Sequence, residues 1–188
     1  MVIMQALNLD NAIILDTETT GLDSDARILE VSIIDAQTGI KLYSSLVNPL
    51  CSISPEVTAI HGITNDMVID MPTFDKVWND IKGYLSDSVI YVYNLDFDYR
   101  MFAQSLRPFG YPVANLVHFF GGGVCVMRWY ANFYGSLCGN DVTPRFQRLT
   151  NACYQQDVDT SDLTAHRALA DCEMTRRLIN AVNARLGA

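Results

Sequence analysis

The sequence predicts an α/β fold, because two kinds of periodicity alternate along it. Three β-rich runs separated by turn signals come first, and stretches with helical spacing surround a further apolar run after them. The chain has 188 residues, of which 49% are hydrophobic and 18% charged. This composition can bury a sizeable core, and the length predicts a single domain over residues 1–188.

The first three β-rich runs are predicted to form an antiparallel meander. They cover Ala12–Asp16, Ile28–Asp35 and Ile40–Val47, and the pairs Thr20-Gly21 and Thr38-Gly39 lie in the connections. Threonine–glycine pairs of this kind are typical of turns between strands. The meander therefore brings the end of the first run close to the start of the second.

The remaining elements alternate between helices and short strands. Thr73 can cap a helix over Phe74–Leu85, whose apolar residues share one face, and Ser88–Tyr93 has the pattern of a buried strand. Ala114–Gly123, with its three glycines, is predicted to be a loop or insertion. The other expected elements are a short helical stretch near Glu56–Ile60, a strand at Val124–Val126, and helices near Asp96–Phe109, Met127–Tyr134, Phe146–Tyr154 and Ala168–Leu186.

Charge and cysteine content narrow the classes of protein. The net charge of −8 argues against strong binding of phosphate backbones, but residues 1–127 carry 15 acidic and 6 basic side chains, and residues 128–188 carry 6 and 7. Five scattered cysteines without a C-x-x-C pair predict reduced thiols, with no disulfide framework or structural zinc. No signal peptide or long apolar run is present, which predicts a cytoplasmic protein without a membrane partner.

The stretch LDTETTGL places two carboxylates at the end of the first apolar run. Residues two apart in a strand point to the same face, so Asp16 and Glu18 project side by side. At roughly 6 Å and an effective dielectric of about 20, two bare carboxylates repel each other by about 3 kcal/mol, so a cation is expected between them. A solvated strand end and the start of an aspartyl-phosphate phosphatase are the alternatives, although the phosphatase pattern has an aspartate where Glu18 stands.

A third carboxylate falls where a helix should be apolar. Asp171 lies within the apolar stripe of the helix Ala168–Leu186 at about 100° per residue. An unpaired buried carboxylate is costly, so Asp171 also needs a cation. His166 precedes this helix in HRALAD, and we expect it on the loop that enters the helix, directed at the same site.

Together these residues resemble the ordered motifs of the DEDDh 3′–5′ exonucleases, the group of proofreading polymerase subunits, oligoribonuclease and RNA-trimming exonucleases. The motifs are LDTETTGL with Asp16 and Glu18, YNLDFDYRMF with Asn94 and Asp98, and HRALAD with His166 and Asp171. The segment ISPEVTAIHGIT also resembles the stretch between the first two motifs. The resemblance covers Ile13 to about Leu178, but Tyr93 stands where many members have histidine.

The resemblance implies a ribonuclease H-like fold, with a mixed five-stranded sheet whose first three strands are antiparallel and with helices on both faces. It also implies two Mg²⁺ or Mn²⁺ ions, since the ligands are all oxygen. Asp16 would bridge both ions, Glu18 and Asp171 would complete the first, and Asp98 would hold the second. His166 would accept the proton of the attacking water.

The implied reaction is the release of nucleoside monophosphates from single-stranded 3′ ends, with DNA favoured over RNA. Thr19, Leu22, His61, Asn94 and Phe97 correspond to contacts with the terminal nucleotide, and four arginines could contact phosphates: Arg128, Arg145, Arg148 and Arg167. A polymerase or another replication or repair protein is an implied partner, and the oligomeric state stays open. A non-catalytic nucleic-acid-binding module of the same fold and a metal-dependent phosphatase remain the alternative interpretations.

Helical spacing separates the two aspartates of the second motif. Asp98 shares a face with Met101 and Phe102, which must pack on the sheet, so it is expected to point inward. Asp96 lies on the polar face, where it can pair with Arg100 at i,i+4.

Overall fold

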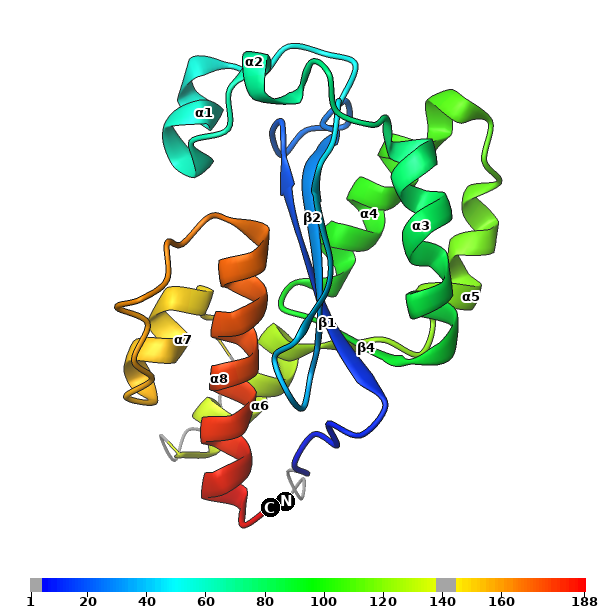
Figure 1. The fold of residues 1–188 in the computed structure, drawn as a ribbon. Coiled ribbons are helices and arrows are strands. Elements are labelled where there is room, and N and C mark those ends of the chain that lie inside the picture. Colours follow the sequence, from blue (N-terminus) through cyan, green and yellow to red (C-terminus); the bar gives the residue numbers. More distant parts are fainter. Residues whose placement is uncertain (1–4, 138–144) are drawn as a thin grey trace.

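A computed structural model describes residues 5–137 and 145–188 and contains a mixed five-stranded sheet between two groups of helices (Figure 1). The strand order is β3-β2-β1-β4-β5. Strands β1, β2 and β3 pair antiparallel, whereas β4 pairs parallel to β1 and β5 parallel to β4. This is the sheet that the family resemblance implied. The strands are β1 (Ala12–Thr19), β2 (Ile28–Asp35), β3 (Lys41–Leu46), β4 (Val89–Val92) and β5 (Val124–Cys125).

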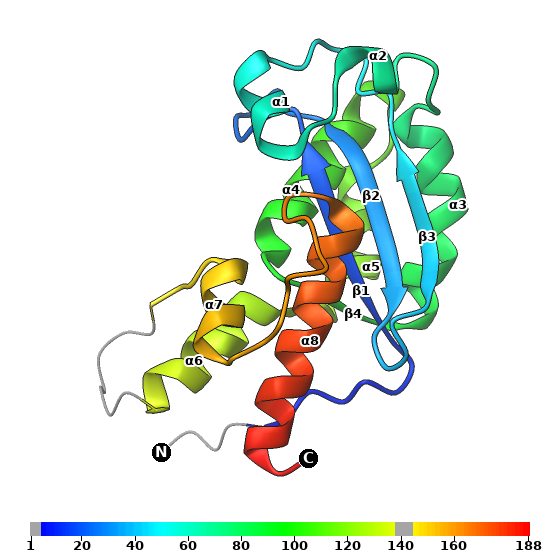
Figure 2. The same cartoon turned by 60° about the vertical axis from the view of Figure 1, so that its left-hand side comes forward.

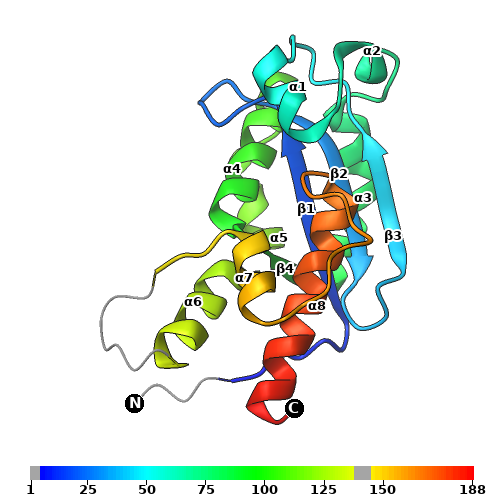
Figure 3. The same cartoon turned by 90° about the vertical axis from the view of Figure 1, so that its left-hand side faces the viewer.

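Helices cover both faces of this sheet. On one face lie α3 (Phe74–Asp87), α4 (Leu95–Leu106) and α5 (Val117–Phe120). On the other lie α6 (Val126–Leu137), α7 (Leu149–Gln155) and α8 (Ala168–Leu186), as Figure 3 shows from that side. Two short helices stand beyond the carboxyl end of β1, namely α1 (Pro55–His61) and α2 (Asn65–Val68), and Figure 2 shows both above the sheet.

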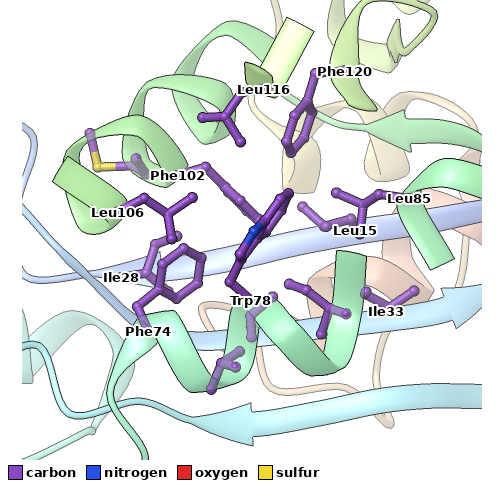
Figure 4. Packing of buried hydrophobic residues seen from close by; sticks show 14 of the residues in the cluster. Leu15, Ile28, Ile33, Phe74, Trp78, Leu85, Phe102, Leu106, Leu116 and Phe120 are labelled. Atoms are coloured by element: carbon purple, nitrogen blue, oxygen red, sulfur yellow. The ribbon is translucent and has the colours of Figure 1, made fainter. Parts of the chain in front are cut away.

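Strand β1 is buried on both faces, and its alternation decides which layer each residue meets. Ile13 and Leu15 pack with α3 and α4, whereas Ala12 and Ile14 pack with α6 and α8. Figure 4 shows the first of these cores, in which Trp78 packs edge-on to Phe102 with ring centroids 6.0 Å apart. Continuing the alternation, Asp16 and Glu18 share the face of Ile14, toward α8, and Thr17 shares the face of Leu15, toward α4.

The segment predicted as a loop or insertion, Ala114–Gly123, is partly helical, so the loop alternative was wrong. Residues 113–120 form a 3₁₀ helix (Val113–Leu116) followed by α5. Leu116 and Phe120 are buried in the core, and the ring of Phe119 lies 4.9 Å from that of Trp78. Contact with α3 and α4 therefore orders a stretch whose local sequence favours turns.

Most other boundaries agree with the prediction to within a few residues. Strand β1 continues past Asp16 through Glu18, and α4 ends at Leu106, where a 3₁₀ turn (Arg107–Phe109) follows. Helix α7 begins at Leu149, so Phe146 lies outside it. The cysteines at 51, 125, 153 and 172 are free, and the remaining one lies outside the described residues. Within the described ranges, every helix is too short or too polar to cross a membrane.

Candidate active site

The end of β1 projects beyond its neighbour β4. The last pair between these strands joins Leu15 to Val92, so Asp16 and the residues after it have no strand on that side. Helix α4 begins three residues after β4 and fills this position. The shortness of β4 thus brings α4 next to the two carboxylates of β1.

Asp98 points into this junction, as the helical spacing predicted. It is 3% exposed, and its Oδ1 accepts a 2.7 Å hydrogen bond from the Thr17 hydroxyl. Thr17 therefore holds the α4 carboxylate from the opposite face of β1. The sequence prediction did not include Thr17, because a threonine between two acids carries no signal of its own.

Asp96 is exposed, as predicted, but its expected partner was wrong. Its carboxylate pairs with Arg128 of α6 instead of Arg100. Arg100 donates to the Leu22 carbonyl at 3.0 Å and lies over the ring of Phe97, 5.4 Å from its centroid. The i,i+4 pair does not form because each side chain has another partner that is distant in sequence: Arg128 for Asp96 and the Leu22 carbonyl for Arg100.

The loop before α8 brings the third motif to the same place. His166 has φ +63°, in the left-handed region that residues with a β-carbon rarely adopt, and its backbone N–H donates to Asp171 Oδ1 at 3.3 Å. Ligand atoms of Glu18, His166 and Asp171 all lie within 4.8 Å of one another. His166 therefore lies on the loop that enters α8, as expected, with Glu18 and Asp171 close to it.

An ion pair between a buried glutamate and a half-exposed arginine fixes this loop to the sheet. Glu30 lies opposite Glu18 in the pairing of β1 with β2 and is 4% exposed. Its carboxylate accepts from Arg167 Nη2 at 2.7 Å and Nε at 3.1 Å, and from the Ala168 backbone N–H at 2.9 Å. Such a two-point contact constrains both position and orientation. Arg167, considered above for phosphate contact, is therefore engaged within the protein.

Glu30 was not among the predicted site residues, although the sequence carries a signal for it. The residue is an acid within ILEVSIID, where five of the eight residues are apolar and seven of the eight positions are buried. An ionised group at such a position requires a partner.

Burial raises the pKa of all four carboxylates, and mutual repulsion adds to this for Asp16 and Glu18. Burial raises the pKa of Asp16 well above its usual range, and the charges of Asp98, Asp171 and Glu18 raise it further. Burial and the Asp171 charge raise the pKa of Glu18 to about 8. Burial also raises the pKa of Asp98 to about 7, against the opposing Thr17 hydrogen bond, and that of Asp171 to about 6.

This donor set fits divalent cations of the Mg²⁺ class. The four carboxylates offer only oxygen atoms as ligands, and one imidazole lies beside them. Oxygen ligands suit Mg²⁺ and Mn²⁺. The Arg167 charge lowers the pKa of Glu18, but Glu30 already engages that guanidinium. A bound cation would stabilise the charged form of these buried carboxylates and offset the repulsion at Asp16 and Glu18.

The residues predicted to contact substrate lie around the same end of β1. Leu22 is 77% exposed, Phe97 is half-buried under Arg100, and Asn94 is exposed at the start of α4. The hydroxyl of Thr19 donates to the Gly21 carbonyl at 2.8 Å and is engaged in the turn.

His61 brings a buried polar atom to the site. Its Nδ1 accepts from the Ile63 N–H at 2.9 Å, so in the neutral ring Nε2 carries the proton. Nε2 is buried and makes no hydrogen bond to any residue that the structure describes. Burial lowers the pKa of His61, and Arg167 and His166 add to this change, while Glu30 and the nearby backbone of Thr19 oppose it.

Comparisons with known proteins agree with this geometry. The RNase_T exonuclease family model matches residues 13–179. The uncharacterized exonuclease CP81 of Escherichia phage 186 is 35% identical over 174 residues, which are 92% of this chain and 88% of the phage protein. DNA polymerase III subunit epsilon of Rickettsia typhi is 34% identical over 99 residues, and the match spans 50% of this chain and 43% of that subunit.

Solved structures share the fold. Exonuclease X in complex with 5′-overhanging duplex DNA aligns over 92% of both chains with a TM-score of 0.64 and 27% identity. E. coli exonuclease I in complex with a dA16 oligonucleotide aligns over 93% of this chain and 42% of its own, with a TM-score of 0.72 and 18% identity, which supports the fold alone.

The family match contains every residue of the carboxylate cluster. Asp16, Glu18, Asp98 and Asp171 all lie within residues 13–179, as does His166. Because the chain matches an exonuclease family, neither the phosphatase interpretation nor the non-catalytic interpretation is retained. The chain belongs to the DEDD-type 3′–5′ exonuclease family and is an enzyme of that class.

Proposed function

We propose that this exonuclease removes nucleoside monophosphates one at a time from single-stranded 3′ ends, DNA in preference to RNA, with two bound Mg²⁺ or Mn²⁺ ions. The observation that carries the proposal is the convergence of Glu18, His166 and Asp171 within 4.8 Å, beside the half-buried Asp16 and the buried Asp98. Phosphodiester hydrolysis needs this combination of cation ligands and a proton acceptor.

In this proposal, Asp16, Glu18, Asp98 and Asp171 hold the cations. When bound, divalent cations supply positive charge to the phosphate oxygens and lower the pKa of water. The protein's own contribution is rigidity, because Asp16 and Glu18 stand on a buried strand and the Thr17 hydroxyl fixes Asp98.

His166 is proposed to accept the proton of the attacking water. It is exposed to solvent, so its imidazole can exchange that proton with bulk water. The Glu30–Arg167 ion pair stands directly after it and limits the movement of its backbone. An imidazole is suited to this role because its pKa lies near neutrality.

The terminal nucleotide is proposed to lie between α1 and α4. Leu22 and Phe97 offer apolar surfaces for the base, and Asn94 offers a polar contact. The Nε2–H of His61 is a donor without a protein acceptor among the described residues, so a substrate oxygen would satisfy it. Thr19 shapes the turn that carries Leu22.

The preference for DNA and the class of partner rest on relatives. The exonuclease X structure contains duplex DNA, and the Rickettsia relative is a subunit of DNA polymerase III. We therefore propose DNA 3′ ends as the substrate and a polymerase or another replication or repair protein as the candidate partner.

A time course with labelled strands tests this proposal. Single-stranded DNA and RNA of one sequence, labelled at the 5′ end, would be incubated with Mg²⁺ beside duplexes with recessed or protruding 3′ ends. We expect a ladder that shortens by single nucleotides, fastest on single-stranded DNA. Faster digestion of RNA, or loss of the label in the first product, would contradict the proposed substrate and polarity.

A further inference from the structure

A cavity opens directly beside the catalytic cluster. It has a volume of about 440 Å³ and shares His166 and Asp171 with the cluster. Its other walls come from the two residues after β4, Tyr93 and Asn94, from the start of α6, and from the segment that leads into α7. Of the residues proposed to hold the terminal nucleotide, Asn94 lines the cavity, whereas Leu22, His61 and Phe97 do not. The cavity therefore continues from the Asn94 side of the nucleotide site, away from the surfaces proposed for the terminal base.

An exposed aromatic ring forms part of the cavity wall. Phe146 lines the cavity and is 61% exposed, whereas most large apolar side chains of the described residues are buried in the core. It lies ahead of α7, in a stretch without regular secondary structure, so no helix periodicity requires an apolar residue there. An exposed aromatic face offers a surface on which a nucleic acid base can stack.

A cation without an ion-pair partner among the described residues stands two residues further on. Arg148 is exposed and lines the cavity, and it forms no ion pair with any residue in 5–137 or 145–188. Most other arginines after residue 127 are paired with carboxylates, namely Arg128, Arg167, Arg176, Arg177 and Arg185. In a chain with a net charge of −8, a free guanidinium beside a catalytic cluster fits an anionic ligand.

The residue between these two is tied to the sheet. The hydroxyl of Tyr93, at the end of β4, donates to the Gln147 carbonyl at 2.8 Å. Tyr93 is 8% exposed and packs in the core under α6 and α8. Phe146 and Arg148 therefore flank an anchored peptide, and the wall has a fixed position relative to Asn94 and the catalytic residues.

We propose that this cavity is a second subsite for single-stranded nucleic acid, in which Phe146 stacks on a base and Arg148 contacts a phosphate of the nucleotides next to the one removed. The proposal rests on the exonuclease function proposed above. A nucleic acid strand is the proposed ligand for two reasons. The cavity is continuous with the catalytic cluster, and it combines the exposed ring of Phe146 with the guanidinium of Arg148. Tyr93 acts as a positioning residue for this wall.

Substrate length separates the subsite from the catalytic chemistry. A dinucleotide with a free 5′-hydroxyl has one nucleoside and no phosphate beyond the scissile phosphate, whereas longer strands add phosphates that can reach the cavity. We expect the kcat/KM of the wild-type chain to rise from two nucleotides to four or more. Arg148→Ala should lower kcat/KM on longer strands by about 5- to 10-fold and change dinucleotide cleavage by less than about twofold, whereas Phe146→Ala, which removes a stacking surface for the nucleoside that a dinucleotide retains, should lower both by about 5- to 10-fold.

Matched variants control for changes in the surface alone. Tyr154→Ala removes an aromatic ring that is 84% exposed and lies outside the cavity. Arg107→Ala removes an exposed arginine that also lies outside it. Neither should change the dependence on length. An equal loss in Arg107→Ala and Arg148→Ala would assign the effect to diffuse charge and overturn the subsite.

Salt dependence tests the phosphate contact separately. Each phosphate contact to a single strand contributes about 0.7 to the slope of log KM against log salt concentration. Arg148→Ala should reduce this slope by about that amount, while Phe146→Ala leaves it unchanged. Unchanged kcat/KM in both variants at every length would overturn the proposal. If the wild-type chain cleaves no oligonucleotide with Mg²⁺ or Mn²⁺, the proposed exonuclease function itself fails, and the subsite with it.

Discussion

Raising the pH should destabilise this protein when divalent cations are removed. Glu18 has its pKa raised from 4.5 to about 8, and Asp98 and Asp171 have theirs raised from 3.8 to about 7 and about 6. Between these limits the unfolded chain has released its protons while the folded protein keeps them. Stability is therefore full below about pH 4 and is lost as the pH rises toward 8.

The magnitude follows from the shift of one residue. As the pH rises from the ordinary pKa of 4.5 to pH 7, Glu18 alone lowers the free energy of unfolding by up to about 3 kcal/mol, at about 1.4 kcal/mol for each pH unit. The contributions of the four carboxylates are coupled and do not add. For a chain of this size, a loss of 3 kcal/mol lowers the melting temperature by roughly 6–12 °C.

Thermal unfolding in EDTA at several pH values between 5 and 8 measures this effect directly. The melting temperature should fall with pH, and added Mg²⁺ or Mn²⁺ should restore it, most strongly at pH 8, because cations bind the deprotonated ligands. Glu18→Gln should flatten the metal-free profile, while Asp96→Asn, which removes an exposed acid, should leave it unchanged. A metal-free stability that is constant or rises with pH would refute the reasoning.

Three further predictions concern catalysis. Asp98→Asn should abolish most nuclease activity while the fold stays intact, whereas Asp96→Asn should cost little in either measurement. Chelation should remove activity, and His166→Ala should lower kcat by about 10²–10⁴-fold at saturating Mg²⁺, as expected for loss of a general base. Glu30→Gln should lower kcat with KM nearly unchanged, because the loop of His166 loses its anchor, and should cost about 1–3 kcal/mol in denaturant unfolding.

Each of these predictions has an outcome that contradicts it. A larger loss in Asp96→Asn than in Asp98→Asn would mean that the second motif is misaligned by two residues. Full activity in metal-free buffer, or an undiminished His166→Ala, would exclude the assigned roles of the cluster. If Glu30→Gln raised KM and left kcat unchanged, Glu30 would act on substrate binding and not on the position of His166.

Local periodicity predicted the elements that carry the catalytic cluster. The bounds of β2 and α8 agree with the sequence prediction, because a continuous apolar run and a helical stripe define them without reference to distant residues. The inward direction of Asp98 also followed from helical spacing. All five residues of the proposed catalytic cluster could therefore be identified before their arrangement was known.

Contacts between distant parts of the chain could not be predicted in this way. Glu30 and Arg167 are separated by 137 positions, and Tyr93 and Gln147 by 54. No local period encodes such pairs. The pairing of Asp96 with Arg128 likewise replaced the local pair expected from i,i+4 spacing. Helix α5 formed because Phe119 and Phe120 pack against α3 and α4, although its glycine-rich surroundings favour a turn.

Counting the bound cations tests the proposed mechanism most directly. Electron paramagnetic resonance titration with Mn²⁺, in the presence of a nucleoside monophosphate, measures how many ions each chain binds. The account predicts two ions for the wild-type chain and for Asp96→Asn, and one for Asp98→Asn. Wild-type chains that bind no Mn²⁺, or an Asp98→Asn variant that binds as many ions as the wild type, would contradict it.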